Sequence, residues 1–303
     1  MTGNRDTGLA ILAVVAAVLL WGAQFPVAKA AYATLDPYTL TSARYVLAAT
    51  VLVSLAAATG GRAALSPGPR PWLLVVAGVL GMAGSPLLAF VGLSYTLPEH
   101  AVIIVALQPS MTAMAQWWLN GKRPANFTLV AIAVAFAGVV LVVASHGFRP
   151  GETKLFGDLM VLAGCSCWIC YTLLLARFPG FGALRFTALT CFIGMLVICT
   201  VTAIALASGA VPVPQAASFV SVAPHIAFLA IPGVVLAMVL WNYGNARIGP
   251  LNSMLIINLM PVETYFIRYV EGARFTWQEW TGAALVIGAL VANNVYQRRQ
   301  TAR

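Results

Sequence analysis

Apolar runs of about 20 residues follow one another along almost the whole chain. A helix of about that length spans the roughly 30 Å of hydrocarbon in a bilayer. Backbone groups in lipid must be paired within the segment, and the ten-residue alternation of a barrel strand is absent, so the runs are expected to be helices. The sequence therefore predicts an all-α membrane protein with ten transmembrane helices. We place them at residues 8–31, 38–58, 72–95, 99–119, 126–145, 157–177, 183–208, 222–246, 251–270 and 277–296.

The first run follows a few polar residues and has no small-residue cleavage site after it. We therefore expect a retained helix and not a signal peptide. Prolines stand at or beside most of the proposed joints, as in residues 66–69 (SPGP), where a missing N–H does least harm. All connections are short, so the function is expected to lie within the bilayer or at its edges.

Composition supports the membrane class, because 61% of the residues are apolar and only 8% are charged. A soluble domain carries about 25% charged residues. The net charge of +9 does not indicate nucleic-acid binding, since the basic residues are spread over separate segments without an aromatic and basic groove.

The positions of Lys and Arg predict the topology, because these residues accumulate on the cytoplasmic side of membrane proteins. With the N-terminus inside, eleven of the seventeen lie on that side: Arg5, Arg62, Arg70, Lys122, Arg123, Arg177, Arg185, Arg247, Arg298, Arg299 and Arg303. Most acids lie toward the other side: Asp36, Glu99, Glu152, Asp158, Glu271 and Glu279. We expect a protein of the bacterial inner membrane with both termini cytoplasmic.

The second half of the chain repeats motifs of the first half. Residues 21–25 (WGAQF) correspond to residues 168–172 (WICYT), and residues 108–109 (QP) correspond to residues 260–261 (MP). Five runs separate the copies, and because this number is odd the second copy enters the membrane upside down. We predict two inverted five-helix repeats, residues 1–148 and 149–303.

Together these motifs resemble the drug/metabolite transporter superfamily, specifically its EamA-type ten-helix branch. The resemblance covers almost the whole chain and includes Leu-Trp-Gly in the first run, Arg44-Tyr45 in the second and Gly157-Asp158-Leu in the sixth. It implies a secondary transporter of small metabolites, with helices 1, 3, 4, 6, 8 and 9 around a central cavity and helices 5 and 10 at the periphery. The family's Gly-Glu-Arg motif is altered here to residues 121–123 (GKR) and 272–274 (GAR), so any role of that acid is absent.

Polar and aromatic side chains inside the apolar runs are the candidates for substrate binding. Residues three or four apart share one helix face, as do Trp21 with Gln24 and Trp168 with Tyr171 in the two repeats. The predicted substrate-binding set is Trp21, Gln24, Tyr95, Gln108, Met111, Trp168, Tyr171, Trp241, Asn242, Asn258 and Glu263. Aromatic planes with neutral hydrogen-bonding groups suit a small amphipathic or zwitterionic solute such as an amino acid, and the family resemblance implies neutral or aromatic amino acids. The alternative is that Tyr and Trp mark the membrane interfaces for reasons unrelated to substrate.

Four prolines inside the runs are candidate hinges for alternating access, because each removes a backbone hydrogen bond. They are Pro26, Pro86, Pro109 and Pro261. The alternative is that they serve helix packing alone.

Glu263 lies about 12 residues into the ninth run, which is about 18 Å along a helix, so its carboxylate is expected deep in the membrane. A charge there tends to mark a pathway, and Glu263 could carry a proton. The alternatives are a structural partner for Arg44 or Lys29 and a position nearer the membrane surface than the proposed run implies. Lys29, Arg44 and Arg268 are expected to extend toward the membrane surface, as long cationic side chains near helix ends do.

Nothing in the sequence indicates an enzyme, a cofactor or a metal site. Cys167 and Cys170 form a CxxC within an apolar run, without a nearby His, and are expected to be packing residues. The zinc-protease, nucleotide-binding and nucleophile-elbow motifs are absent.

From the apolar runs, the repeats and the family resemblance together we predict an exporter or exchanger of small metabolites such as neutral or aromatic amino acids. A passive channel or facilitator, efflux of drugs or other metabolites, and an intramembrane enzyme are the alternatives; the ion coupling and the oligomeric state stay open.

Overall fold

The chain is built of helices in the computed structural model, which describes residues 2–121, 123–144 and 153–301. The helical class predicted from the apolar runs is confirmed, and seven segments of the described chain are long and apolar enough to cross a bilayer. The first half contains α1 (Thr2–Ala31), α2 (Pro37–Ala64), α3 (Pro71–Ala77), η1 (Gly78–Gly84), α4 (Ser85–Tyr95), α5 (Pro98–Val105), α6 (Gln108–Asn120) and α7 (Asn126–Ala144). The second half contains α8 (Thr153–Leu175), α9 (Ala183–Ala207), α10 (Ala216–Ser221), α11 (Ala223–Ala230), η2 (Ile231–Leu236), α12 (Ala237–Ile248), α13 (Pro250–Ile256), α14 (Leu259–Val270) and α15 (Trp277–Thr301).

Some sequence predictions fall on residues outside the described part. The expected boundary between residues 148 and 149 lies there, as do Lys122, Glu152 and Arg303.

Local sequence signals explain where several helices begin and end. The Asp36 carboxylate caps α2 by accepting hydrogen bonds from the backbone N–H of Tyr38 at 2.9 Å and of Thr39 at 3.0 Å. Pro37 occupies the first turn, where its missing N–H needs no partner. Gly121 follows α6 with φ of 67°, a left-handed conformation that glycine adopts without strain.

Two of the predicted spans are interrupted where the sequence suggested continuous helices. The run at 99–119 is divided into α5 and α6, and the run at 251–270 into α13 and α14. At each break the chain makes a tight turn, with N–H to C=O bonds from Leu107 to Ile104 at 3.0 Å and from Met260 to Ile257 at 2.9 Å. Pro109 and Pro261 follow directly, and a proline ring disrupts the helix preceding it.

Two other spans contain a short π-helical segment in the middle. It is η1 between α3 and α4, and η2 between α11 and α12. Pro86 follows η1, and Pro232 lies in η2. A π segment leaves the regular hydrogen-bond ladder, which frees backbone carbonyls for other partners, and such segments are frequent at functional sites.

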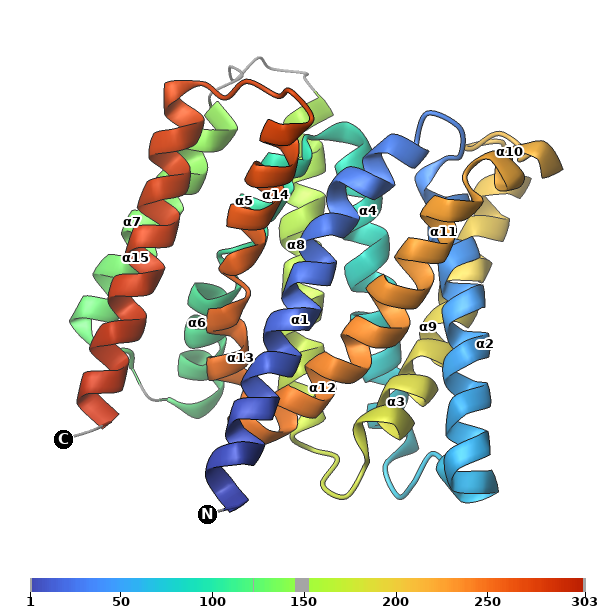
Figure 1. Ribbon diagram of the computed structural model, residues 1–303, viewed down its shortest axis with the longest axis horizontal. Helices are drawn as coiled ribbons and strands as arrows, with labels where there is room; N and C mark the ends of the chain where they lie inside the picture. Colours follow the sequence, from blue (N-terminus) through green and yellow to red (C-terminus); the bar gives the residue numbers. More distant parts are fainter. Residues whose placement is uncertain (1, 122, 145–152, 302–303) are drawn as a thin grey trace.

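Helices of the two halves of the chain alternate in space (Figure 1). The N- and C-termini lie on the same side of the molecule, and α1 and α8 run in opposite directions across the view. Helix α1 packs on α12 and α14, α4 packs on α8, α2 packs on α9, and α7 packs on α15. The α7–α15 pair stands at one edge of the molecule (Figure 1). Every one of these contacts joins the first half to the second.

Glycines allow the closest of these approaches. A Cβ atom on Gly138 of α7 would lie 2.6 Å from the carbonyl oxygen of Gly282, and a Cβ on Gly282 of α15 would lie 2.5 Å from that of Gly138. Gly92 of α4 and Gly157 of α8 form the same kind of reciprocal contact. Small residues let helix backbones approach closely in membranes, so these glycines fix the crossings of α7 with α15 and of α4 with α8.

Candidate functional site

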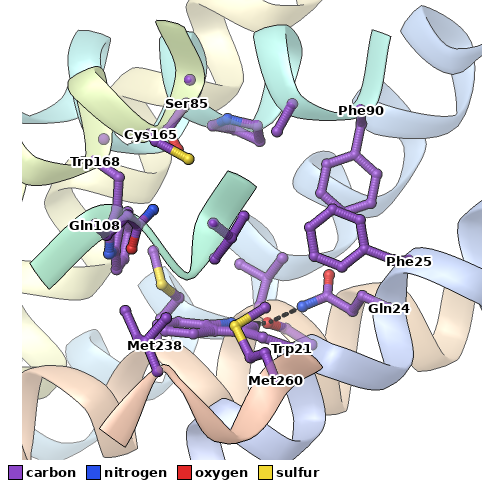
Figure 2. Close-up of a pocket in the computed structure, with 18 of the residues that line it drawn as sticks. Trp21, Gln24, Phe25, Ser85, Phe90, Gln108, Cys165, Trp168, Met238 and Met260 are labelled. Atoms are coloured by element: carbon purple, nitrogen blue, oxygen red, sulfur yellow. Dashed lines mark hydrogen bonds between the residues drawn. The ribbon is translucent and has the colours of Figure 1, made fainter. Parts of the chain in front are cut away.

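A central cavity of about 110 Å³ lies among the interrupted helices and those that pack on them. In Figure 2, Gln108 and Trp168 lie on one side of it and Phe25 and Phe90 on the opposite side, with Met238 and Met260 below. Its walls come from both halves of the chain, since α1, α2, η1, α4, α5 and α6 contribute from the first and α8, η2, α12, the α13–α14 break and α14 from the second. The residues lining it are Trp21, Gln24, Phe25, Arg44, Tyr45, Gly81, Ser85, Pro86, Ala89, Phe90, Val105, Gln108, Gly164, Cys165, Trp168, Gly233, Val234, Met238, Ile257 and Met260.

Aromatic rings from the two halves meet at this cavity. The rings of Trp21 and Trp168 are in an edge-to-face arrangement with centroids 5.2 Å apart. Trp241 lies behind them, with its ring centroid 5.1 Å from that of Trp21 and 5.7 Å from that of Trp168. On the opposite wall Phe25 and Phe90 stack at 5.7 Å. These rings give the cavity an apolar lining suited to a flat or apolar part of a ligand.

The π segment η2 supplies a backbone acceptor to the same cavity. The Gly233 carbonyl oxygen accepts hydrogen bonds from Trp21 Nε1 at 3.0 Å and from Gln24 Nε2 at 3.2 Å, the latter drawn in Figure 2. Gln24 reaches this carbonyl because Gly233 has no side chain: a Cβ there would lie 2.6 Å from the Gln24 amide carbon. The polar group of α1 is therefore oriented by η2.

Arg44 is a lining residue that the sequence analysis placed elsewhere. Its side chain was expected to extend to the membrane surface, but Arg44 is only 1% exposed. Its Nη1 donates to Gln24 Oε1 at 3.0 Å, and the guanidinium lies 3.7 Å from the centroid of the Phe90 ring. The prediction was wrong because sequence spacing gives the position of Arg44 along its helix but not the direction it faces.

Four members of the predicted substrate-binding set line the cavity: Trp21, Gln24, Gln108 and Trp168. Gln108 is 5% exposed, and its Oε1 is a buried acceptor that has no hydrogen-bond partner in the described part of the chain. Gln108 therefore offers a ligand a hydrogen-bonding group on the wall opposite Phe25 and Phe90.

The other members of the set lie away from the cavity lining. Tyr95 is the last residue of α4, is partly exposed and contacts Phe156. Met111 packs against the hydrophobic core, and Asn258 is buried at the break between α13 and α14. Trp241 supports the two lining tryptophans from behind.

Tyr171 and Asn242 form a buried structural network and not a wall of the cavity. Asn242 Nδ2 donates to Tyr171 Oη at 2.9 Å and to Thr187 Oγ1 at 2.8 Å. Both residues are fully buried, and the Tyr171 ring fills the space that a Cβ on Gly81 would need. The network ties α8, α9 and α12 together, so the repeat relation between Gln24 and Tyr171 does not make both of them lining residues.

Glu263 is half-buried on α14, where its carboxylate lies against Gly22 of α1. The neighbouring Thr264 hydroxyl donates to the Gly22 carbonyl at 3.0 Å, which holds α14 against α1 at this point. No hydrogen-bond partner of Glu263 Oε2 is found among the residues that the structure describes. The residue is outside the cavity lining, and the alternative that it pairs with Arg44 or Lys29 is wrong, since it forms no ion pair with either.

Lys29, near the C-terminal end of α1, and Arg268, near the C-terminal end of α14, each have several hydrogen-bond or ion-pair partners. Lys29 Nζ donates to the carbonyls of Leu93 at 2.7 Å, Ser94 at 3.1 Å and Thr96 at 2.7 Å, and so caps the end of α4. Arg268 pairs with Glu99 at 3.4 Å and with Glu271 at 2.7 Å.

A second hollow of about 480 Å³ lies between α14 and α15. Its described lining residues are apolar or aromatic, and none of them is charged. Its lining comes from α14 and α15 of the second half alone, whereas both halves line the central cavity, so we place the functional site at the central cavity.

Comparison with known proteins supports the membrane transporter class. A family model described as the EamA-like transporter family matches residues 8–144 and matches again at residues 155–295. The chain therefore belongs to the EamA-like transporter family and is a multi-pass membrane protein.

Individual relatives carry transporter names. The chain is 30% identical to "Uncharacterized transporter YrdR" of Bacillus subtilis, over 95% of this chain and 92% of the relative. It is 31% identical to "Uncharacterized transporter YyaM" of the same organism, over 90% of each. It is 26% identical to "Aromatic amino acid exporter YddG" of Ancylobacter novellus, over 54% of this chain and 56% of that protein. A solved crystal structure superposes with a TM-score of 0.70 at 23% identity, covering 96% of this chain and 97% of that one, which supports the fold.

Proposed function

We propose that this protein is a secondary transporter that exports or exchanges small metabolites, such as neutral or aromatic amino acids, by alternating access. The observation that carries the proposal is the central cavity, which is lined by aromatic and neutral polar side chains from both halves of the chain. Such a lining suits a small solute with an apolar body and a few hydrogen-bonding groups. The similarity to an aromatic amino acid exporter supports the same substrate class.

We further propose that ten helices form two inverted five-helix repeats. Supporting this, η1 and η2 interrupt corresponding spans, and the α5–α6 and α13–α14 breaks interrupt the spans that follow. Gln24 occupies the space beside Gly233 of η2, while its repeat counterpart Tyr171 occupies the space beside Gly81 of η1. Inverted repeats allow two related gates to open in turn on opposite sides of a site near the midplane.

The breaks and π segments are the proposed hinges. Pro86, Pro109 and Pro261 stand directly beside such interruptions, whereas Pro26 lies within the continuous α1. A helix changes direction most easily where its hydrogen-bond ladder is already incomplete.

We place both termini in the cytoplasm from the distribution of Lys and Arg, with the protein in the bacterial inner membrane. We propose that a single chain is the transport unit, because its two halves together surround the central cavity.

Counter-flow in proteoliposomes tests the proposal. Vesicles that contain the purified protein are loaded with unlabelled L-phenylalanine, and uptake of a trace of labelled L-phenylalanine is followed. An alternating-access exchanger shows saturable uptake that unlabelled substrate on the inside accelerates. We expect Trp168→Ala to reduce this uptake by about tenfold or more, since a buried Trp contact with a ligand commonly contributes that much.

Trp118→Ala is the matched control, because Trp118 is 85% exposed on α6 and outside the cavity lining. Its uptake should equal that of the unmodified protein. Uptake that rises linearly with concentration and ignores the internal substrate would identify a passive facilitator. Equal losses in the two Trp variants would place the substrate site away from the central cavity.

A further inference from the structure

Arg44 is a buried cation with more N–H donors than hydrogen-bond partners. A guanidinium carries five N–H donors and stays protonated in proteins. Within the described part of the chain its one hydrogen bond goes from Nη1 to the neutral Gln24 Oε1, and Nε has no partner there. Among the described residues no carboxylate lies within 4.0 Å of it. A buried charge is costly unless it is paired, and within a membrane an unpaired charge commonly marks a functional site.

The other cations of the same region show what full pairing looks like in this chain. Lys29 donates to three carbonyl oxygens, which satisfies all three of its N–H groups. Arg268 contacts two carboxylates. Arg44 is more deeply buried than either, yet it has one neutral partner and the face of an aromatic ring.

The titratable neighbours of Arg44 do not supply the missing negative charge. Tyr32, Tyr45 and Cys191 interact with it electrostatically, and phenols and buried thiols are neutral near pH 7. Arg44 also lines the central cavity, and no other charged side chain is among the described residues that do so. The cavity thus has one fixed positive charge, no fixed negative charge and walls of aromatic rings.

We propose that Arg44 binds the carboxylate of the transported solute, and that the substrates are carboxylates with an aromatic or apolar body. This inference rests on the proposed transport function. A carboxylate accepts parallel hydrogen bonds from a guanidinium, a stronger interaction than the neutral contact with Gln24. The body of the solute would lie against Phe25, Trp21 and Trp168. Because none of the described lining residues is an acid, an ammonium group adds little to binding, and a solute with an ammonium group alone is repelled by Arg44.

Three probes with the same ring and different polar ends test the proposal in the purified protein. They are L-phenylalanine with both groups, 3-phenylpropanoate with the carboxylate alone and phenethylamine with the ammonium alone. Equilibrium binding is measured in detergent at pH 7 by intrinsic tryptophan fluorescence and by the shift of the melting temperature, since a ligand that binds the folded state raises it. We expect the first two probes to bind and phenethylamine not to bind.

Variants assign the effect to Arg44. Arg44→Gln should weaken binding of 3-phenylpropanoate by about tenfold to a hundredfold, the usual effect of removing a hydrogen bond to a charged group. Arg44→Lys keeps the charge and should retain part of the affinity. Arg185→Gln is the matched control, because Arg185 also lies over a phenylalanine ring, 4.1 Å from Phe181, but is outside the cavity lining. Its affinity should equal that of the unmodified protein.

Phenethylamine binding as tightly as 3-phenylpropanoate would overturn the proposal on the unmodified protein alone, whether or not Arg44→Gln folds. Unchanged affinity in a folded Arg44→Gln would overturn it too. Carboxylate-selective binding without counter-flow would support the role of Arg44 and refute transport. Counter-flow of amines that Arg44→Gln leaves unchanged would support transport and refute this substrate class.

Discussion

The crossing of α7 and α15 allows a quantitative test of the packing, by changing Gly282 to Ala. The added Cβ would lie 2.5 Å from the Gly138 carbonyl oxygen and 2.6 Å from Val142 Cγ2, whereas ordinary contact begins at 3.4 Å. The helices must therefore separate locally by close to 1 Å, and a gap of that size removes about a quarter to a half of the dispersion energy of each affected atom pair. Overpacking of this kind costs about 1 to 3 kcal/mol of folding free energy.

Gly288→Ala on the same helix is the control, because no described atom outside the adjoining helix backbone lies within 4 Å of a Cβ placed there. That substitution should leave the stability unchanged or raise it by up to about 1 kcal/mol, the difference in helix propensity between Gly and Ala. The apparent melting temperature of the purified protein in detergent gives the comparison, and Gly282→Ala should melt several degrees lower than Gly288→Ala. Equal melting temperatures would show that α7 and α15 do not cross at these glycines.

Three further substitutions test single contacts. Glu263→Gln should abolish uphill uptake driven by an imposed pH gradient if Glu263 carries the coupled proton, and equal uptake in both proteins would remove that role. Lys29→Met leaves three carbonyls at the end of α4 without their donor and should lower the folding free energy by about 1 to 3 kcal/mol, seen as earlier thermal unfolding; unaltered melting would show that Lys29 does not cap α4. Tyr171→Phe removes the oxygen that accepts from Asn242 and should cost about 1 kcal/mol of stability without weakening ligand binding, whereas weaker binding at full stability would place Tyr171 in the site.

The sequence predicted the helices well because their signal is long and simple. Apolar runs of about 20 residues locate the helices within a few residues, and the repeated motif around Trp21 and Trp168 identified two residues that meet at the cavity. Polar residues such as Gln24 and Gln108 were recognisable because few polar side chains occur in these runs.

The remaining lining residues left no comparable signal. Phe25, Phe90 and Met238 face the cavity, but an apolar side chain that faces a cavity looks in sequence like one that faces lipid. The Gly233 carbonyl became available through a π segment, which no composition rule indicates. Arg44 was misplaced because a cation near a helix end either extends to the surface or turns inward, and only the rotation of α2 decides between them.

The packing of the two halves limits how the cavity can open. Residues 8–144 and 155–295 each match the family model, yet α1 packs on α12 and α14, α4 on α8, α2 on α9 and α7 on α15, so each half makes its main contacts with the other. The crossings at Gly92 with Gly157 and at Gly138 with Gly282 have backbone atoms in contact, so these helix pairs separate only at a high cost in packing energy. Two halves interleaved in this way do not rock against one another as independent bodies. Under the proposed alternating access, the cavity therefore opens by bending of helices where η1, η2 and the two breaks already interrupt them, and not by separation of the two halves.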